Sequence, residues 1–238
     1  MYLFVHIPKT GGQTLRNHFI KHLVFHQEFI HLGPYGVQDA EKRGLKPFAA
    51  RSEEERRRAF VILGHYVASE TYKLVPGKEP HYVTFLRDPA ERLISLYNFT
   101  MHYEHERKGV PKISFEAWYH HTPKLSMTQW ICRHFLGKTQ ADLARVDTLE
   151  LARATLDRFW FVGTLETFDE DVAYLLQDLG LPPVEGQSNV TGDHYERTMA
   201  LSDRWREEMY QDYENDLRLH RLYRDRRRDA LKTERPFP

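Results

Sequence analysis

The sequence predicts an α/β protein in three layers, with a central, mostly parallel sheet flanked by helices. Short β-rich runs at 2–5, 60–63 and 81–86 have the length of strands. The run at 60–63 has no polar interruption, which is typical of an interior parallel strand. Segments with apolar residues at helical spacing follow these runs. At 238 residues the chain suits one large domain, so we interpret residues 1–238 as a single unit.

The first fourteen residues, MYLFVHIPKTGGQT, predict a buried strand, a glycine loop and the start of a helix. Two consecutive glycines let backbone N–H groups turn toward a ligand at the positive end of that helix. A lysine before the glycines adds a cation, and the threonines add hydroxyl donors. The stretch therefore predicts a phosphate-binding loop, and the alternative is an ordinary turn with a solvated lysine. The candidate binding residues are Lys9, Thr10, Gly11, Gly12, Gln13 and Thr14.

The loop is P-loop-like but differs from the loop of nucleotide hydrolases. The order G-x-x-x-x-G-K-[ST] is absent, because here Lys9 precedes both glycines. An ATP-dependent phosphotransferase or hydrolase, whose loop also joins a strand to a helix, is therefore disfavoured. A non-catalytic protein that binds a nucleotide or another anion stays open as a further class.

The next elements follow in order. A helix is expected from Gln13 to about His26, and residues 31–50 are expected to form a loop with little regular structure. Ser52, followed by acids at 53–55, predicts the capped start of a short helix.

Polar residues follow the next two strands. His65 comes one residue after Gly64 at the end of the run at 60–63, and Arg87 comes directly after 81–86. Ligands of open α/β sheets bind outside the carboxyl ends of the strands. We therefore expect Lys9, His65 and Arg87 to share one edge of the sheet.

The segment after Arg87 predicts a helix with a complete start signal. Asp88 is suited to the cap, Pro89 to the first helical position and Glu91 to the third. Arg87 is suited to gripping a phosphate through two parallel N–H bonds, and Ser95 two turns into the helix is suited to donating another. The alternative role for Arg87 is a structural salt bridge to Asp88 or Glu91.

The composition of the chain argues against some classes of binding partner. Lysine plus arginine (34) balances aspartate plus glutamate (34), so no global field points to nucleic acid or a membrane surface. No apolar stretch is long enough to span a bilayer, and Met1 leads directly into the first strand, so we expect a cytoplasmic protein without membrane insertion. No pattern of metal ligands stands out. The remaining predicted elements are helices over 114–120, 126–135, 149–159 and 168–179, a strand over 160–163, and one long helix from Ser202 to about Arg226.

The P-K-T-G-G-x-T loop and the R-D-P-x-x-R-x-x-S-x-Y segment together resemble two motifs of the sulfotransferase superfamily. These motifs bind the 5′-phosphosulfate and the 3′-phosphate of the sulfuryl donor 3′-phosphoadenosine 5′-phosphosulfate (PAPS). The carbohydrate branch, which includes the heparan sulfate and dermatan uronyl 2-O-sulfotransferases, is most similar. The resemblance implies that residues 9–14 hold the 5′-phosphosulfate, and that Arg87 and Ser95 hold the 3′-phosphate.

The resemblance also implies a mechanism. The carbohydrate branch has a Gly-His pair after the next strand whose histidine is the base, and Gly64-His65 matches it. It implies in-line transfer of the sulfuryl group to an acceptor hydroxyl, on a glycan or small glycoside, with His65 as base and Lys9 neutralising the leaving group. Val190 and Thr191 lie where the family closes a loop over the nucleotide; plain turn chemistry is the alternative there.

Overall fold

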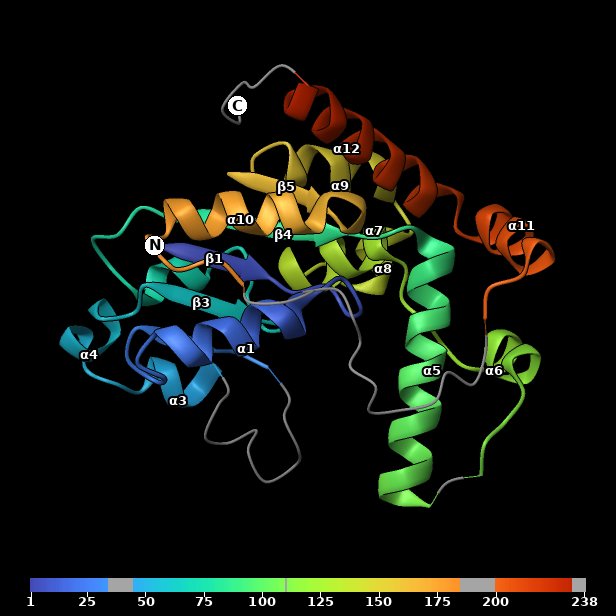
Figure 1. The fold of residues 1–238 in the computed structure, drawn as a ribbon, viewed down its shortest axis with the longest axis horizontal. Coiled ribbons are helices and arrows are strands. Elements are labelled where there is room, and N and C mark those ends of the chain that lie inside the picture. Colours follow the sequence, from blue (N-terminus) through green and yellow to red (C-terminus); the bar gives the residue numbers. More distant parts are fainter. Residues whose placement is uncertain (34–44, 110, 185–199, 233–238) are drawn as a thin grey trace.

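The computed structural model describes residues 1–33, 45–109, 111–184 and 200–232. Its sheet is parallel throughout and has the strand order β2-β3-β1-β4-β5. The predicted three-layer α/β fold is confirmed (Figure 1). The strands are β1 (Tyr2–Val5), β2 (Phe29–His31), β3 (Val61–Gly64), β4 (His81–Leu86) and β5 (Phe161–Thr164).

Helices connect the strands and extend beyond them. Two helices begin where the sequence predicts a cap, at Ser52 and Asp88, and a third begins after Ser114. The side chains of all three residues accept backbone N–H groups of the first turn. The helices are α1 (Gly12–His22), α3 (Leu45–Ala49), α4 (Glu53–Arg57), α5 (Pro89–Lys108), α6 (Phe115–His121), α7 (Met127–Trp130) with a π-helical turn (Ile131–Phe135), α8 (Gln140–Leu143), α9 (Thr148–Leu156), α10 (Phe168–Asp178), α11 (Asp203–Asp212) and α12 (Glu214–Lys232). Short 3₁₀ turns span Thr71–Leu74 and Leu165–Thr167.

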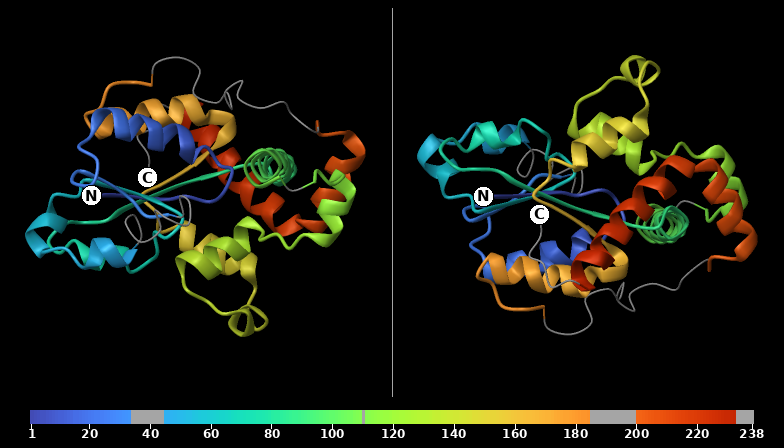
Figure 2. Two further views of the ribbon diagram at one scale, coloured as in Figure 1. Left: turned by 90° about the horizontal axis from the view of Figure 1, so that it is seen from below. Right: turned by 90° about the horizontal axis from the view of Figure 1, so that it is seen from above.

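The two faces of the sheet carry separate apolar cores. Because side chains alternate along a strand, Tyr2 and Phe4 face a core shared with α1 and α10, whereas Leu3 and Val5 face a core shared with α3, α9 and α12. The two layers of helices lie on opposite sides of the sheet when it is seen edge-on (Figure 2). β1 is thus buried on both faces at the centre of the sheet.

A third apolar cluster joins α5, α6 and α11 beyond the carboxyl ends of the strands (Figure 1). Trp118 of α6, Tyr97 of α5 and Met209 of α11 are buried in it. The cluster anchors α5, and α5 begins directly beside the edge where polar residues were expected.

The prediction of one long helix from Ser202 to about Arg226 is wrong. The chain leaves helical geometry at Tyr213 (φ −115°, ψ 37°) between α11 and α12. Met209 packs on α5, whereas Asp216, three residues beyond the break, accepts the backbone N–H groups of Met127 and Thr128 at the start of α7. The break at Tyr213 lies between these two contacts.

The expectation of little regular structure over 31–50 is wrong at the two ends of that range, and residues 34–44 lie outside the described part of the chain. β2 ends at His31 and pairs with β3 through Ile30 and Ile62, and α3 spans Leu45–Ala49. The three residues of β2 are too few to give a periodic signal, and their pairing with β3 is a long-range contact.

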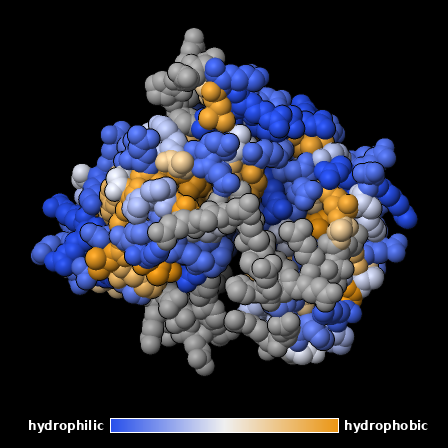
Figure 3. Space-filling view, in the orientation of Figure 1, coloured by the Kyte–Doolittle hydropathy of each residue, from blue (hydrophilic) through white to orange (hydrophobic). Residues whose placement is uncertain are grey.

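The visible surface is mainly hydrophilic along α12, and its hydrophobic patches are separate from one another, over the layer of α1 and α10 and on the right of the view, on the side of α5 and α11 (Figure 3). The exposed large apolar residues include Ile20 of α1 and Val24, which follows that helix. Within the described part of the chain, no helix combines the length and apolar character needed to cross a membrane.

Candidate functional site

The loop between β1 and α1 has two positions that accept only glycine. Gly11 has a left-handed φ of +86°, and a Cβ there would lie 2.4 Å from the ring of Phe168. A Cβ at Gly12 would lie 2.3 Å from the ring of His6. The backbone of the loop therefore packs against side chains behind it.

The N-terminus of α1 is suited to binding an anion. Its N-cap, Gly11, provides no side-chain cap, and the first turn of this 11-residue helix contains no acidic residue. The first N–H groups of a helix lack intrahelical partners and carry partial positive charge, so an uncapped start favours a bound anion. Thr10 is buried and its hydroxyl donates to the carbonyl of Ile7, which holds the loop in shape. Gln13 is exposed and bonds to Asn17.

Lys9 lies in this loop with a left-handed φ of 70°. Its Nζ is 4.4 Å from the centroid of the Phe99 ring on α5, and its backbone carbonyl accepts a hydrogen bond of 3.3 Å from Arg87. Burial, and to a smaller extent the charge of Arg87, lower the pKa of Lys9 to about 8. The hydrogen bond from Arg87 therefore joins the loop to the end of β4. The lowered pKa means that Lys9 loses its charge at a lower pH than an ordinary lysine.

Arg87 lies between the loop and α5. Its ion pair with Glu91 is long, at 3.9 Å, and Glu91 also lies 3.3 Å from Arg206 of α11. The side chain of Arg87 is 27% exposed. Ser95 is half-buried two turns further along α5. A salt bridge to Glu91 alone does not account for the position of Arg87, because an exposed pair at this distance contributes little.

His65 follows β3 and lies beside β1. Its Nδ1 is 2.6 Å from the backbone carbonyl of His6. A carbonyl oxygen only accepts, so Nδ1 carries the proton and Nε2 has a lone pair. Burial is the main reason that the pKa of His65 is lowered, with a smaller contribution from His134, while the bond to His6 opposes the shift. His65 is therefore a neutral base at pH 7.

A family of known proteins fits this arrangement. The sequence model of the sulfotransferase family matches residues 2–228. The chain belongs to the sulfotransferase family.

Other comparisons give more distant likenesses to this sulfotransferase. The crystal structure of a sulfotransferase from Alicyclobacillus acidocaldarius is 17% identical, with a TM-score of 0.46, and the match covers 93% of this chain and 94% of that one. Mouse sulfotransferase SULT7A1, complexed with PAP, is 13% identical with a TM-score of 0.38, and the match covers 77% of this chain and 60% of that one. No curated protein sequence matches.

Sequence reasoning found most of the residues that the fold of the sulfotransferase brings together. The loop residues 9–14, Arg87 and His65 follow β1, β4 and β3, which are neighbours in the sheet. Val190 and Thr191 lie outside the described residues. Sequence reasoning missed His6, although it directly precedes the loop; its relation to His65 depends on strand register, which no local pattern shows.

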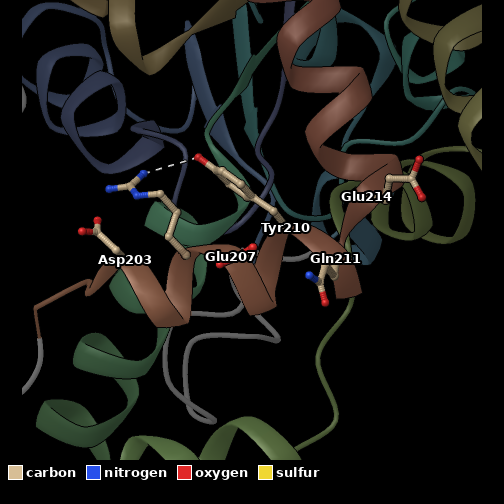
Figure 4. Close-up of a pocket in the computed structure, with 6 residues that line it drawn as sticks. Asp203, Glu207, Tyr210, Gln211 and Glu214 are labelled. Atoms are coloured by element: carbon tan, nitrogen blue, oxygen red, sulfur yellow. Dashed lines mark hydrogen bonds between the residues drawn. The ribbon is translucent and has the colours of Figure 1, made fainter.

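A cavity of about 520 Å³ lies along α11 of the sulfotransferase (Figure 4). Three carboxylates and a single guanidinium line it, so it is unsuited to an anionic nucleotide. None of the loop residues contributes. Its lining consists of Asp203, Arg206, Glu207, Tyr210, Gln211 and Glu214. Within the described ranges, no group of three or more His, Cys, Asp or Glu residues is arranged to hold a metal ion.

Proposed function

We propose that this sulfotransferase moves the sulfuryl group of PAPS to a hydroxyl of a carbohydrate acceptor. The observation that carries the proposal is the meeting of three elements at one edge of the sheet. The uncapped N-terminus of α1, the cation of Lys9 and the neutral imidazole of His65 follow adjacent strands. Transfer of a group from an anionic donor to a hydroxyl requires a site that binds the anion and, beside it, a base that takes the hydroxyl proton.

The residues present fit a phosphosulfate donor. Residues 9–14 offer backbone N–H groups, the ammonium of Lys9 and the hydroxyl of Thr14 to the 5′-phosphosulfate, and Thr10 takes part through its backbone, because its own hydroxyl donates to Ile7. Arg87 would hold the 3′-phosphate, because its guanidinium is accessible and tied to the same loop. Ser95 would add a hydroxyl donor from α5, and Val190 and Thr191 would cover the nucleotide.

Bound PAPS would supply the sulfuryl group, which gains a bond to the acceptor oxygen as its bond to the 5′-phosphate breaks and 3′-phosphoadenosine 5′-phosphate (PAP) leaves. His65 takes the acceptor proton on Nε2, because Nδ1 already donates to the carbonyl of His6. Lys9 and the first N–H groups of α1 stabilise the negative charge of the departing phosphate. The base follows β3 and the cation follows β1, and these two strands are paired neighbours in the sheet.

The carbohydrate acceptor rests on the resemblance of the two motifs to the carbohydrate branch. One contact supports it: Phe99 is 43% exposed beside Lys9 and offers a flat apolar surface next to the reacting centre. Sugar rings present apolar C–H faces, so such a ring suits them.

The experiment that tests the function starts with nucleotide binding. A ligand that binds only the native state raises the melting temperature. We expect PAP to do so more strongly than ADP, or than ATP with magnesium. A panel of glycosides and short glycans, incubated with PAPS and analysed by mass spectrometry for sulfated product, then identifies the acceptor. A larger shift with magnesium ATP, or PAP binding without transfer to any acceptor, would overturn the proposal.

Replacing Arg87 by alanine tests the site of the 3′-phosphate. We expect the Kd for PAP to rise about 10- to 100-fold, the loss expected for charge-assisted hydrogen bonds. The Kd for adenosine 5′-phosphosulfate, which lacks the 3′-phosphate, should change little. The control is Arg58→Ala, because Arg58 lies at the end of α4, where it forms an exposed ion pair with Glu54. Equal weakening of both nucleotides in Arg87→Ala would contradict the assignment.

The pH dependence of kcat/KM should be bell-shaped. The pKa of His65 is lowered by burial, so the neutral base is lost only as the pH falls below the ordinary histidine range near 6.5. The pKa of Lys9 is about 8, so its charge and the rate are lost as the pH rises through that value. Lys9→Arg keeps the charge at every pH and should remove the alkaline limb. An unchanged alkaline limb in that variant would show that another group titrates.

A further inference from the structure

The ring of His6 lies face to face with the ring of His65. Their centroids are 4.3 Å apart and their planes differ by 19°. The pair forms because β1 and β3 run in register, with Val5 opposite Gly64, and each histidine is the next residue of its chain segment. The His6 N–H also donates to the carbonyl of Gly64 at 3.3 Å. Strand pairing therefore fixes the stack.

The ring of His6 also touches the start of α1. Only the absence of a Cβ at Gly12 leaves room for it, since that atom would lie 2.3 Å from the His6 Cδ2 and Nε2 atoms. One imidazole thus lies in contact with both the base and the helix N-terminus. The spacing between His65 and the anion site depends on the thickness of this ring.

His6 is surrounded by groups that disfavour its charge. Its charged or chargeable neighbours are His65 after β3, His31 of β2 and Lys9 of the loop, and Gly12 of α1 brings no carboxylate. Its Nδ1 is buried without a hydrogen-bond partner among the described residues. Burial first, and then these neighbours, hold the pKa of His6 well below its usual value. The ring of His6 therefore stays neutral, and it contributes to the stack as a flat surface and not as a charge.

We propose that the side chain of His6 is a positioning residue that fixes the ring plane of His65 and its distance from the N-terminus of α1. The ring covers one face of His65 and excludes water from it, while the backbone carbonyl of His6 fixes the tautomer. The proposal rests on the proposed role of His65 as the base. A flat side chain without ring nitrogens should fulfil the same role.

The test compares His6→Ala with His6→Phe. Without the ring, His65 is free to turn and water reaches its face. We expect His6→Ala to lower kcat about 10- to 100-fold, as expected for a misplaced reacting group. The apparent pKa of His65 in the pH profile should rise toward the ordinary histidine value, because a less buried imidazole pays a smaller penalty for carrying charge. The other groups facing His65 are His134 and Trp130, which both variants retain. His6→Phe should keep kcat within about threefold and leave the profile in place.

A second measurement separates this inference from the function itself. The ring C–H resonance of His65, assigned by its loss in His65→Gln, is followed through its titration by NMR in the protein without substrate. We expect the titration to move to higher pH in His6→Ala and to stay in place in His6→Phe, whether or not transfer is detected. An unmoved titration in a folded His6→Ala, or equal damage in both variants, would overturn the positioning role. Failure of transfer in the unmodified protein with a shifted titration would instead overturn only the function.

Discussion

Replacing His65 by alanine is expected to lower kcat by about 10²–10⁴-fold, the contribution of a positioned general base. The reason is the hydrogen bond of its Nδ1 to the carbonyl of His6, which leaves Nε2 as the accepting nitrogen. The acid limb of the pH profile should disappear with the base. The Kd for PAP should change by less than about threefold, because the imidazole acts on the acceptor and not on the nucleotide.

The matched control is His134→Gln. His134 is an exposed histidine whose ring stacks on Trp130, the same tryptophan that the ring of His65 approaches edge-on. Its removal deletes an imidazole from the neighbourhood without touching the carboxyl edge of β3. Near-normal kcat in His65→Ala, with PAP binding intact, would show that another group takes the proton.

Replacing Asp171 by alanine is expected to lower the free energy of unfolding by about 3–5 kcal/mol, as when a buried ion pair loses one partner. The Asp171 carboxylate is fully buried and accepts from Arg227 of α12, the Thr167 hydroxyl and the backbone N–H of Thr164. It therefore ties α12 to β5 and α10. Its loss leaves the guanidinium of Arg227, 5% exposed, without this partner.

The two halves of this pair should behave differently. Burial raises the pKa of Asp171 to about 6 even though Arg227 opposes the shift. In Arg227→Met the carboxyl group can take up a proton, whereas a guanidinium cannot release one. Arg227→Met should therefore be less destabilising than Asp171→Ala. Because the folded state then binds this proton more tightly than the unfolded chain, the stability of Arg227→Met should increase as the pH falls.

Urea denaturation followed by circular dichroism measures both effects. The control is Glu150→Ala, which removes the bonds between Glu150 and Arg153 on the surface of α9. Exposed pairs of this kind contribute little, so the midpoint should hardly move. Equal midpoints for the buried and the exposed variants would show that the link between α12 and β5 is not what stabilises the fold.

Local signals predicted the parts of the molecule that are determined by a few neighbouring residues. The Asp88 cap and Pro89 at the first helical position marked the start of α5, and the structure confirms it. β4 begins at His81 and ends at Leu86, as predicted. Parallel strands end at one edge, so the placing of the loop beside Arg87 followed from the order of strands and helices.

The parts that escaped prediction depend on contacts between distant segments. No glycine or proline marks the break at Tyr213, which arises because α11 and α12 pack on different partners. His6 reads locally as part of a strand end. Its stacking on His65 depends on pairing between β1 and β3, which are far apart in the sequence.

The central place of β1 in the sheet has a consequence for how the protein folds. Tyr2 pairs with Val61 on one side and with His81 on the other. The first strand can therefore pair only after segments about 60 to 80 residues further along the chain have been synthesised. Closing such long loops precedes any gain from pairing, which makes parallel sheets of this kind slow to fold. The loop that contains Lys9 lacks its packing partners until β3 and β4 have paired with β1. The capacity to bind the donor should therefore appear in a single late kinetic phase, together with the central sheet.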